Sequence, residues 1–296
     1  MAHRVLTVQQ AGAALWPRGI QVHYRSPTEQ ERRALTELVG TLWGGVTPPA
    51  APELAVLALQ ARMELELWTI EGRPTWVVRE AADEPRGLGI YLVHAAAAPR
   101  GRPILLQAPH VYFDRQTQYV AAAMFWATGV PDQIHGLFTN SVHRFQRAES
   151  VRDRRAFNPA DVAHNSEHPF QSATSAVVEH GPVVVIQLHG FDGESRSSTV
   201  TAIVSAARPE GSTAESSHAA STLHSVVGAA VARYPEETKS YGGLGNVQGR
   251  LVATSTDARF VHIELELGLR KRMTDPALAA RWVRALVDAI ESSRTP

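Results

Sequence analysis

Two histidines and an acidic residue follow apolar runs of the sequence, at the points where buried strands would end. The run Pro103–Leu106 leads to His110 and Asp114, and the run Val183–Leu188 leads directly to His189. Imidazoles and a carboxylate are ligands that zinc takes in hydrolases, where one coordination position stays open for water. His110, Asp114 and His189 are therefore candidate metal ligands. The alternative is that each histidine is a hydrogen-bonded structural residue.

A third apolar run, Phe260–Leu267, alternates apolar residues with polar ones. The alternation places His262, Glu264 and Glu266 on one face of the predicted strand. A carboxylate beside an activated water serves as the general base in metal hydrolases. Glu264 and Glu266 are therefore candidate bases. An exposed strand face would also explain these acids.

Two basic residues near these segments could bind a negatively charged group of a substrate. Arg270 opens the cluster Arg270–Arg272 after the third run, and guanidinium groups bind carboxylates and oxyanions. Arg250 follows the glycine-rich stretch Tyr241–Gly249, which lacks the lysine followed by Ser or Thr of a phosphate loop. We expect this stretch to border the cleft, with Arg250 facing the substrate. A solvated strand end is the alternative interpretation for Arg270.

The segment Asp161–His168 contains two histidines four residues apart. His164 and His168 would share a face if the segment were helical, and they could then bind a metal. Pro169 follows directly, and the glutamate is wrongly placed for the zincin pattern. We therefore expect a loop that faces the site, in which His164 contacts the substrate.

Composition excludes several classes of protein. The chain has 296 residues, 29 basic against 29 acidic ones, and no cysteine. Disulfides, thiolate zinc sites and a cysteine nucleophile are excluded, and the balanced charge predicts no nucleic-acid partner. No apolar stretch reaches the roughly 20 residues of a membrane span, and the N-terminus lacks a convincing signal-peptide core. We expect a soluble protein, cytoplasmic or exported with its signal absent from this chain.

The order of predicted elements favours an α/β fold. From residue 103 onward, strands and helices alternate, which predicts a mixed, mostly parallel central sheet flanked by helices. We expect helices at residues 117–128, 170–179 and 221–234, a strand at 200–206, and a last helix that opens at Asp275-Pro276 with an apolar stripe of Leu278, Trp282, Leu286 and Ile290.

The first hundred residues are predicted to support this sheet. Ser26-Pro27-Thr28-Glu29 matches a helix start with Ser26 as the N-cap, and residues 65–70 and 75–79 resemble a hairpin. We expect residues 1–100 to form a helix and strand extension packed on a main domain of residues 101–296.

Pro109-His110, Ile186–Phe191 and Val261–Glu266, in this order at strand ends, resemble the zinc carboxypeptidase superfamily. The pattern is most similar to N-formylglutamate amidohydrolases and poly-gamma-glutamate hydrolases. The resemblance covers roughly residues 103 to 290 and implies a zinc carboxypeptidase-like fold in this part of the chain. Carboxypeptidases place a glutamate three residues after the first histidine, whereas the acid here is Asp114. This spacing favours the amidohydrolase-like branch.

The same resemblance implies roles for individual residues. It implies a zinc ion on His110, Asp114 and His189, with Glu264 as general base. It also implies that Arg144 holds the substrate carboxylate or stabilises the oxyanion; an ordinary surface arginine is an equally good interpretation of Arg144.

The residues and the resemblance together predict a zinc-dependent amide hydrolase that uses a metal-activated water. A short peptide, an N-acyl amino acid or a glutamyl polymer would be its substrate. One alternative is a catalytically inactive carboxypeptidase-like binding or sensor protein. Another is a metal-dependent phosphoesterase, although such sites usually hold two metals on several carboxylates. The sequence leaves the scissile bond, the oligomeric state and the compartment open.

Overall fold

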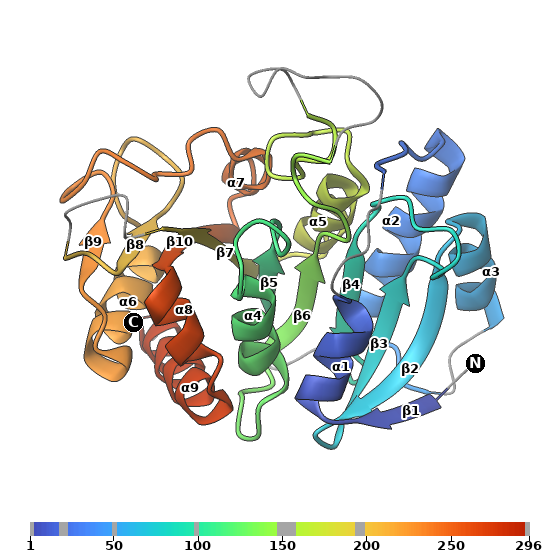
Figure 1. The fold of residues 1–296 in the computed structure, drawn as a ribbon, viewed down its shortest axis with the longest axis horizontal. Helices are drawn as coiled ribbons and strands as arrows, with labels where there is room; N and C mark the ends of the chain where they lie inside the picture. The colour runs from blue at the N-terminus through green and yellow to red at the C-terminus, as the bar shows by residue number, and fades with distance from the viewer. Residues whose placement is uncertain are drawn as a thin grey trace.

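A computed structural model describes residues 3–17, 23–48, 52–97, 101–146, 158–192 and 199–293. In these residues one ten-stranded sheet runs through the molecule in the order β1-β2-β3-β4-β6-β5-β7-β10-β8-β9 (Figure 1). The strands are β1 His3–Leu6, β2 Glu64–Ile70, β3 Arg73–Arg79, β4 Ile90–His94, β5 Ile104–Ala108, β6 Ile134–Thr139, β7 Val183–Phe191, β8 Ala202–Ser205, β9 Val231–Arg233 and β10 Ala258–Glu266.

Helices cover both faces of the sheet (Figure 1). One buried apolar cluster joins one face to α1, α4, α6, α8 and α9, and a second joins the other face to α2, α3, α5 and α7. Their bounds are α1 Val8–Leu15, α2 Glu29–Trp43, α3 Pro52–Gln60, α4 Thr117–Trp126, α5 Pro169–Glu179, α6 Ala214–Thr222, α7 Val247–Ala253, α8 Leu267–Met273 and α9 Pro276–Ser292. Within the described ranges, no helix is both long and apolar enough to cross a membrane.

The predicted α/β fold with a mixed sheet is confirmed. Strands β6, β5, β7 and β10 are adjacent and parallel, whereas β2, β3, β4 and β6 pair antiparallel, as do β10 and β8. Strands β1 to β4, from the first hundred residues, continue the same sheet through the β4–β6 pairing. Because β5, β7 and β10 run in one direction, the residues that follow or end them gather at one edge of the sheet.

The last helix was predicted correctly. Asp275 caps α9 by accepting a hydrogen bond from the backbone N–H of Ala277, with Pro276 in the first turn. Its stripe residues Trp282, Leu286 and Ile290 are buried in the core, and Leu278 packs against that core from a partly buried position.

The helix predicted at residues 221–234 is wrong. Helix α6 starts earlier, because Thr213 and Ser216 form a capping box, and it passes into a turn of π-helix at Leu223–Val227. Gly228, with φ of 70°, ends this turn in a left-handed conformation that suits glycine. The chain then enters β9, which pairs with β8.

The predicted cap of α2 is also wrong. The Thr28 hydroxyl, not Ser26, accepts from the Glu31 N–H, and the Glu31 carboxylate accepts from the Thr28 N–H. Thr28 and Glu31 have the three-residue spacing that a capping box requires.

Helix α5 begins with a buried histidine as its cap. His168 Nδ1 accepts from the Phe170 N–H at 3.1 Å, and its Nε2 lies 2.9 Å from the Gly87 carbonyl oxygen, which can only accept. Both ring nitrogens are satisfied in the neutral ring. Burial lowers the pKa of His168 to about 3, so the folded chain resists its protonation.

We expect this histidine to make stability fall on acidification. Below pH 6.5 the unfolded chain takes up a proton that the folded chain refuses, so about 2 kcal/mol is lost by pH 5. His168→Asn keeps a capping side chain but does not titrate. Urea unfolding at pH 7 and pH 5 should show a pH-dependent loss that is about 2 kcal/mol smaller in the variant. Equal losses in both proteins would contradict the assignment.

Candidate metal centre

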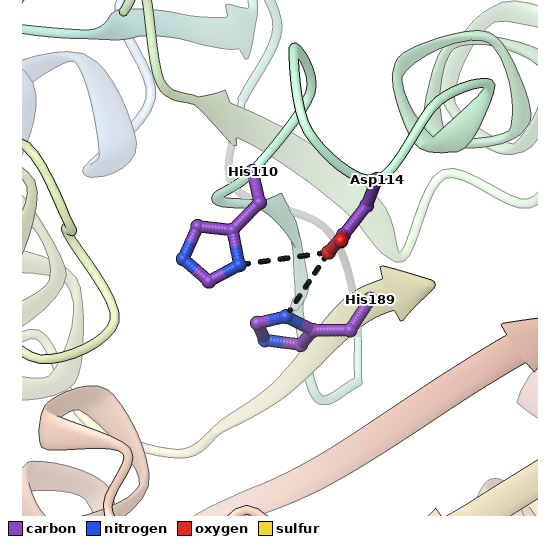
Figure 2. A group of neighbouring side chains, drawn as sticks. All are labelled: His110, Asp114 and His189. Atoms are coloured by element: carbon purple, nitrogen blue, oxygen red, sulfur yellow. Dashed lines mark ion pairs between the residues drawn. The ribbon is translucent and has the colours of Figure 1, made fainter. Parts of the chain in front are cut away.

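The candidate ligands are brought together by the pairing of β5 with β7. These strands are parallel, and Gln107 pairs with Gln187, so both chains reach the same edge of the sheet. After β5 the chain makes a turn in which the Asp114 N–H donates to the His110 carbonyl oxygen at 2.7 Å. This turn returns the Asp114 side chain towards His110, while His189 extends from β7 beside them (Figure 2).

The three side chains form a compact, buried group. Asp114 Oδ2 lies 3.5 Å from His110 Nδ1 and 3.4 Å from His189 Nδ1 (Figure 2). The relative exposure of the three residues is 1%, 3% and 5% in chain order. Ligand atoms in a tetrahedral zinc site stand about 3.3 Å apart, given zinc bonds of about 2.0–2.1 Å. The distances from Asp114 to the two rings match this spacing, and all three residues have ligand atoms within 4.8 Å of one another.

Each histidine ring makes a hydrogen bond through Nε2, on the side away from Asp114. This bond determines whether Nδ1, which faces Asp114, carries a proton or a lone pair. His110 Nε2 lies 2.9 Å from Asp161 Oδ1, and His189 Nε2 lies 2.7 Å from Gln187 Oε1. Because these oxygens accept, each Nε2 carries the proton and each Nδ1 presents a lone pair. Asp114 Oδ2, which both Nδ1 atoms face at ion-pair distance, is buried and makes no closer hydrogen bond to any residue that the structure describes. Lone pairs that converge in this way suit a cation, a role that Arg144 fills in part by donating to His110 Nδ1 at 3.2 Å, and the outer hydrogen bonds are of the kind that metal-bound histidines make.

The protonation states agree in part with metal binding. Burial lowers the pKa of His189 to about 4, so this ring is neutral at pH 7. Burial opposes ionisation of Asp114, but where the rings of His110 and His189 carry a proton towards it, their hydrogen bonds and charge outweigh burial and hold the pKa of Asp114 well below its usual range. A metal would replace these protons. At His110 burial lowers the pKa, whereas Asp114 and Asp161 raise it, and the net direction is upward. A proton therefore competes with a metal at His110.

Glu264 lies beside this group on β10. Glu264 pairs in register with His189 on β7, and its buried Oε2 atom has no hydrogen bond within the described part of the chain. Burial and then the Asp114 carboxylate raise its pKa to about 8, against the opposing effect of Arg270 and Arg144. A divalent cation nearby would act in the same direction as the arginines and favour the carboxylate.

His262 was noted on the face of the third strand but was not predicted as a site residue. It is buried, and its Nε2 lies 3.8 Å from Glu264 Oε1. His189, His262 and Glu264 have ligand atoms within 4.8 Å of one another and form a second group that could hold a cation. His262 lies two residues before Glu264 and therefore on the same strand face, and this spacing could have identified His262 as a site residue.

Two adjoining cavities open onto the metal centre. One, of about 350 Å³, is lined by Asp114, Arg144, Glu264 and Arg270 among others. The other, of about 360 Å³, shares Arg144 and Glu264 and adds His110, His164, His262, Lys239 and residues 242–246. The group of His110, Asp114 and His189 is therefore reached through cavities that Arg144 and Arg270 line.

Both predicted arginines of the first cavity are held in place. Arg144 pairs with Asp161, and its Nη1 lies 3.2 Å from His110 Nδ1. A bound metal would take the place of this last contact. Arg270 is buried, and its Nη1 and Nη2 donate to the carbonyl oxygens of Arg115 and Phe191 at 2.7 and 3.1 Å.

The structure does not bring every predicted residue to the site. Glu266 accepts the Leu269 N–H as the N-cap of α8, and it lines neither cavity. Arg250 lies on α7, where its Nη1 donates to the Gly245 carbonyl oxygen at 2.8 Å, and it lines neither cavity although Gly245 lines the second. The glycine-rich stretch before it does border the second cavity.

The two histidines of residues 161–168 have different surroundings. His164 is half exposed and lines the second cavity, and its Nδ1 lies 3.2 Å from Asp161 Oδ1. His168 is buried at the start of α5. Residues 161–168 are not helical, so the alternative in which both histidines bind one metal from a helix face is wrong.

Comparisons with known proteins give only distant structural similarities. No protein-family profile and no curated protein sequence matches this chain. Among solved structures, a metallo-carboxypeptidase from Burkholderia cenocepacia is 10% identical with a TM-score of 0.43, over 83% of this chain and 71% of that one. An N-formylglutamate amidohydrolase from Ralstonia eutropha is 13% identical with a TM-score of 0.39, over 64% of this chain and 96% of that one. An aminopeptidase from Legionella pneumophila is 13% identical with a TM-score of 0.39, over 91% of this chain and 78% of that one.

Proposed function

We propose that the protein is a zinc-dependent hydrolase of carbon–nitrogen amide bonds. The observation that carries this proposal is the convergence of His110 Nδ1, His189 Nδ1 and Asp114 Oδ2 in a buried group open to a cavity. These three side chains would hold the ion. A zinc ion supplies a Lewis acid that polarises a carbonyl group and lowers the pKa of water to about 7.

Glu264 is assigned the proton transfer in this reaction. Its carboxylate lines both cavities beside His189, and its Oε2 has no hydrogen bond to any described residue. It accepts a proton from the water that attacks the amide carbon, and it returns a proton to the leaving nitrogen as the carbon–nitrogen bond breaks. A base is most effective when its pKa lies near the working pH, and burial moves Glu264 in that direction.

The arginines favour a substrate that carries a carboxylate. Arg144 and Arg270 line the first cavity, and a buried guanidinium binds a carboxylate or a developing oxyanion strongly. A cavity of about 350 Å³ suits a small ligand. We therefore infer a short peptide, an N-acyl amino acid or a glutamyl amide as the substrate.

Metal removal tests this proposal. Chelation should abolish hydrolysis of a panel of N-acyl amino acids and glutamyl amides, and one equivalent of zinc should restore it. Zinc should also stabilise the fold by about 2.7 kcal/mol when its free concentration is a hundred times the dissociation constant. Hydrolysis that survives complete chelation would exclude the metal from the reaction, and magnesium serves as the matched control ion.

A further inference from the structure

A group of buried side-chain amides lies beneath the metal centre. Gln107 on β5, Gln187 on β7, Gln248 on α7 and the α7 cap Asn246 are at most 4% exposed. Gln187 lies two residues before His189 and therefore on the same face of β7. An amide inside an otherwise apolar strand is costly to bury unless all its hydrogen bonds are made. The hydrogen bonds of this group determine which way the Gln187 amide points.

The first constraint starts at a backbone carbonyl group. The Thr174 hydroxyl donates its only hydrogen to the Phe170 carbonyl oxygen at 2.7 Å, so it must accept from Gln107 Nε2, which lies 2.9 Å away. The oxygen of the Gln107 amide therefore faces Gln187. Gln187 Nε2 donates to this oxygen at 2.8 Å.

Two more constraints reach Gln187 from α7. Gln248 Nε2 donates to the Val162 carbonyl oxygen at 2.9 Å, so its Oε1 faces Gln187 Nε2, at 3.3 Å. Asn246 Oδ1 accepts from the Gly249 N–H at 3.0 Å, so its Nδ2 donates to Gln187 Oε1. The carbonyls of Phe170 and Val162 can only accept and the Gly249 N–H can only donate. All three constraints turn Gln187 Oε1 towards His189.

We propose that Gln187 is a positioning residue that holds His189 in the tautomer with its proton on Nε2. Because Gln187 Oε1 can only accept, it requires a proton on His189 Nε2, 2.7 Å away. The Nδ1 lone pair is then directed at Asp114 Oδ2. The role of this lone pair in zinc binding rests on the function proposed above.

The opposite tautomer would remove the ligand. With its proton on Nδ1, His189 could donate to Asp114 Oδ2, which lies 3.4 Å from Nδ1. The two side chains would then form a hydrogen bond, and Nδ1 would have no lone pair for a metal. The amide group disfavours that arrangement, because His189 Nε2 would then place a lone pair against Gln187 Oε1. Such outer partners of metal ligands change metal affinity about 10- to 100-fold.

The tautomer can be measured in the metal-free protein. Nitrogen-15 NMR of histidine-labelled parent protein, assigned with His189→Gln, distinguishes protonated from unprotonated ring nitrogens. We expect His189 to carry its proton on Nε2 at pH 7. A proton on Nδ1 in the folded parent would overturn the proposal. This NMR measurement requires no metal. It therefore tests the tautomer of His189 even if the parent binds no zinc and the proposed function fails.

Three variants connect the tautomer to zinc affinity. Gln187→Met removes the acceptor and should give a mixed tautomer and a zinc dissociation constant 10- to 100-fold higher. Gln187→Glu, buried as the neutral acid, keeps an acceptor towards His189 and an O–H that can donate to Gln107 Oε1 in place of the amide N–H. It should retain the Nε2 tautomer and an affinity within about threefold of the parent's. Thr174→Val loosens the same core but leaves the two constraints from α7, so it should retain both properties.

The pattern among these variants separates positioning from general damage to the core. Folded Gln187→Met with the parental tautomer and affinity would overturn the proposal. A loss in Thr174→Val as large as in Gln187→Met would also overturn it. If Gln187→Met does not fold, retention of tautomer and affinity in Gln187→Glu supports the proposal, and loss of both contradicts it.

Discussion

Replacing Glu264 by glutamine is expected to lower kcat by about 10²- to 10⁴-fold while zinc stays bound. General base catalysis by a positioned side chain contributes a factor of this size. Glutamine has nearly the same shape as glutamate but cannot take up the proton. In the proposed function the ligands are His110, Asp114 and His189, so zinc affinity should change little.

Glu266→Gln is the matched control on the same strand. Glu266 accepts the Leu269 N–H at 3.0 Å as the cap of α8, and a glutamine oxygen can accept this bond as well. We therefore expect kcat within about threefold of the parent's value and a loss of stability of at most about 1 kcal/mol. Equal losses of kcat in the two variants would remove Glu264 from the role of base.

The same pair of variants decides between hydrolysis and mere binding. A carboxypeptidase-like binding or sensor protein would bind zinc and a carboxylate ligand through the same side chains, but it would have no turnover to lose. If neither the parent nor Glu264→Gln hydrolyses any amide of the panel, and both bind zinc equally, the binding alternative replaces the proposed function.

The strand ends were predictable from sequence because apolar runs mark buried parallel strands. Val183–Leu188 has four consecutive β-branched residues, and a polar residue directly after such a run must lie at the edge of the sheet. The grouping of His110, Asp114 and His189 follows from this edge and from the turn after β5. Composition and local spacing are sufficient for these features.

The outer contacts of the site were not predictable in the same way. Asp161 reaches His110 from a segment 51 residues away in the chain, and Arg144 lies between them in sequence. Such contacts depend on how loops pack over the sheet edge, and local periodicity contains no information about it. Gln187 was not singled out either, although a lone amide in an apolar strand is a signal of a hydrogen-bonding role.

Local sequence patterns also gave a wrong prediction where one apolar stretch contains the end of a helix and the start of a strand. Leu223, Val226 and Val227 have helical spacing, yet the helix ends at Gly228 and the chain becomes β9. The left-handed glycine and the pairing of β9 with β8 determine the outcome, and neither follows from the spacing of the apolar residues. Arg250 shows the same limit, since it lies on α7 and lines neither cavity.

Removing a ligand should have the largest effect on metal binding. Loss of an outer partner costs about 10- to 100-fold in metal affinity, and loss of a ligand itself costs more. We expect His110→Ala, Asp114→Asn and His189→Ala each to raise the zinc dissociation constant by more than about 100-fold and to abolish hydrolysis. Competition with a chromogenic chelator measures the first effect, and the amide panel measures the second.

His262→Ala is the matched control for the ligand variants, because His262 is equally buried but belongs only to the second group, with His189 and Glu264. If the ion lies on His110, Asp114 and His189, His262→Ala retains one zinc per chain. Loss of zinc in His262→Ala and Glu264→Gln, with retention in His110→Ala and Asp114→Asn, would instead place the ion in the second group and leave Glu264 unable to act as a base. Two metals per chain in the parent would contradict a single-zinc site and agree with the phosphoesterase alternative or with a two-metal peptidase, because both use paired ions; hydrolysis of phosphate esters against amides then distinguishes these two. Anomalous scattering at the zinc edge distinguishes these arrangements, since His189 is common to both groups and the position of the ion relative to this ring identifies the other ligands.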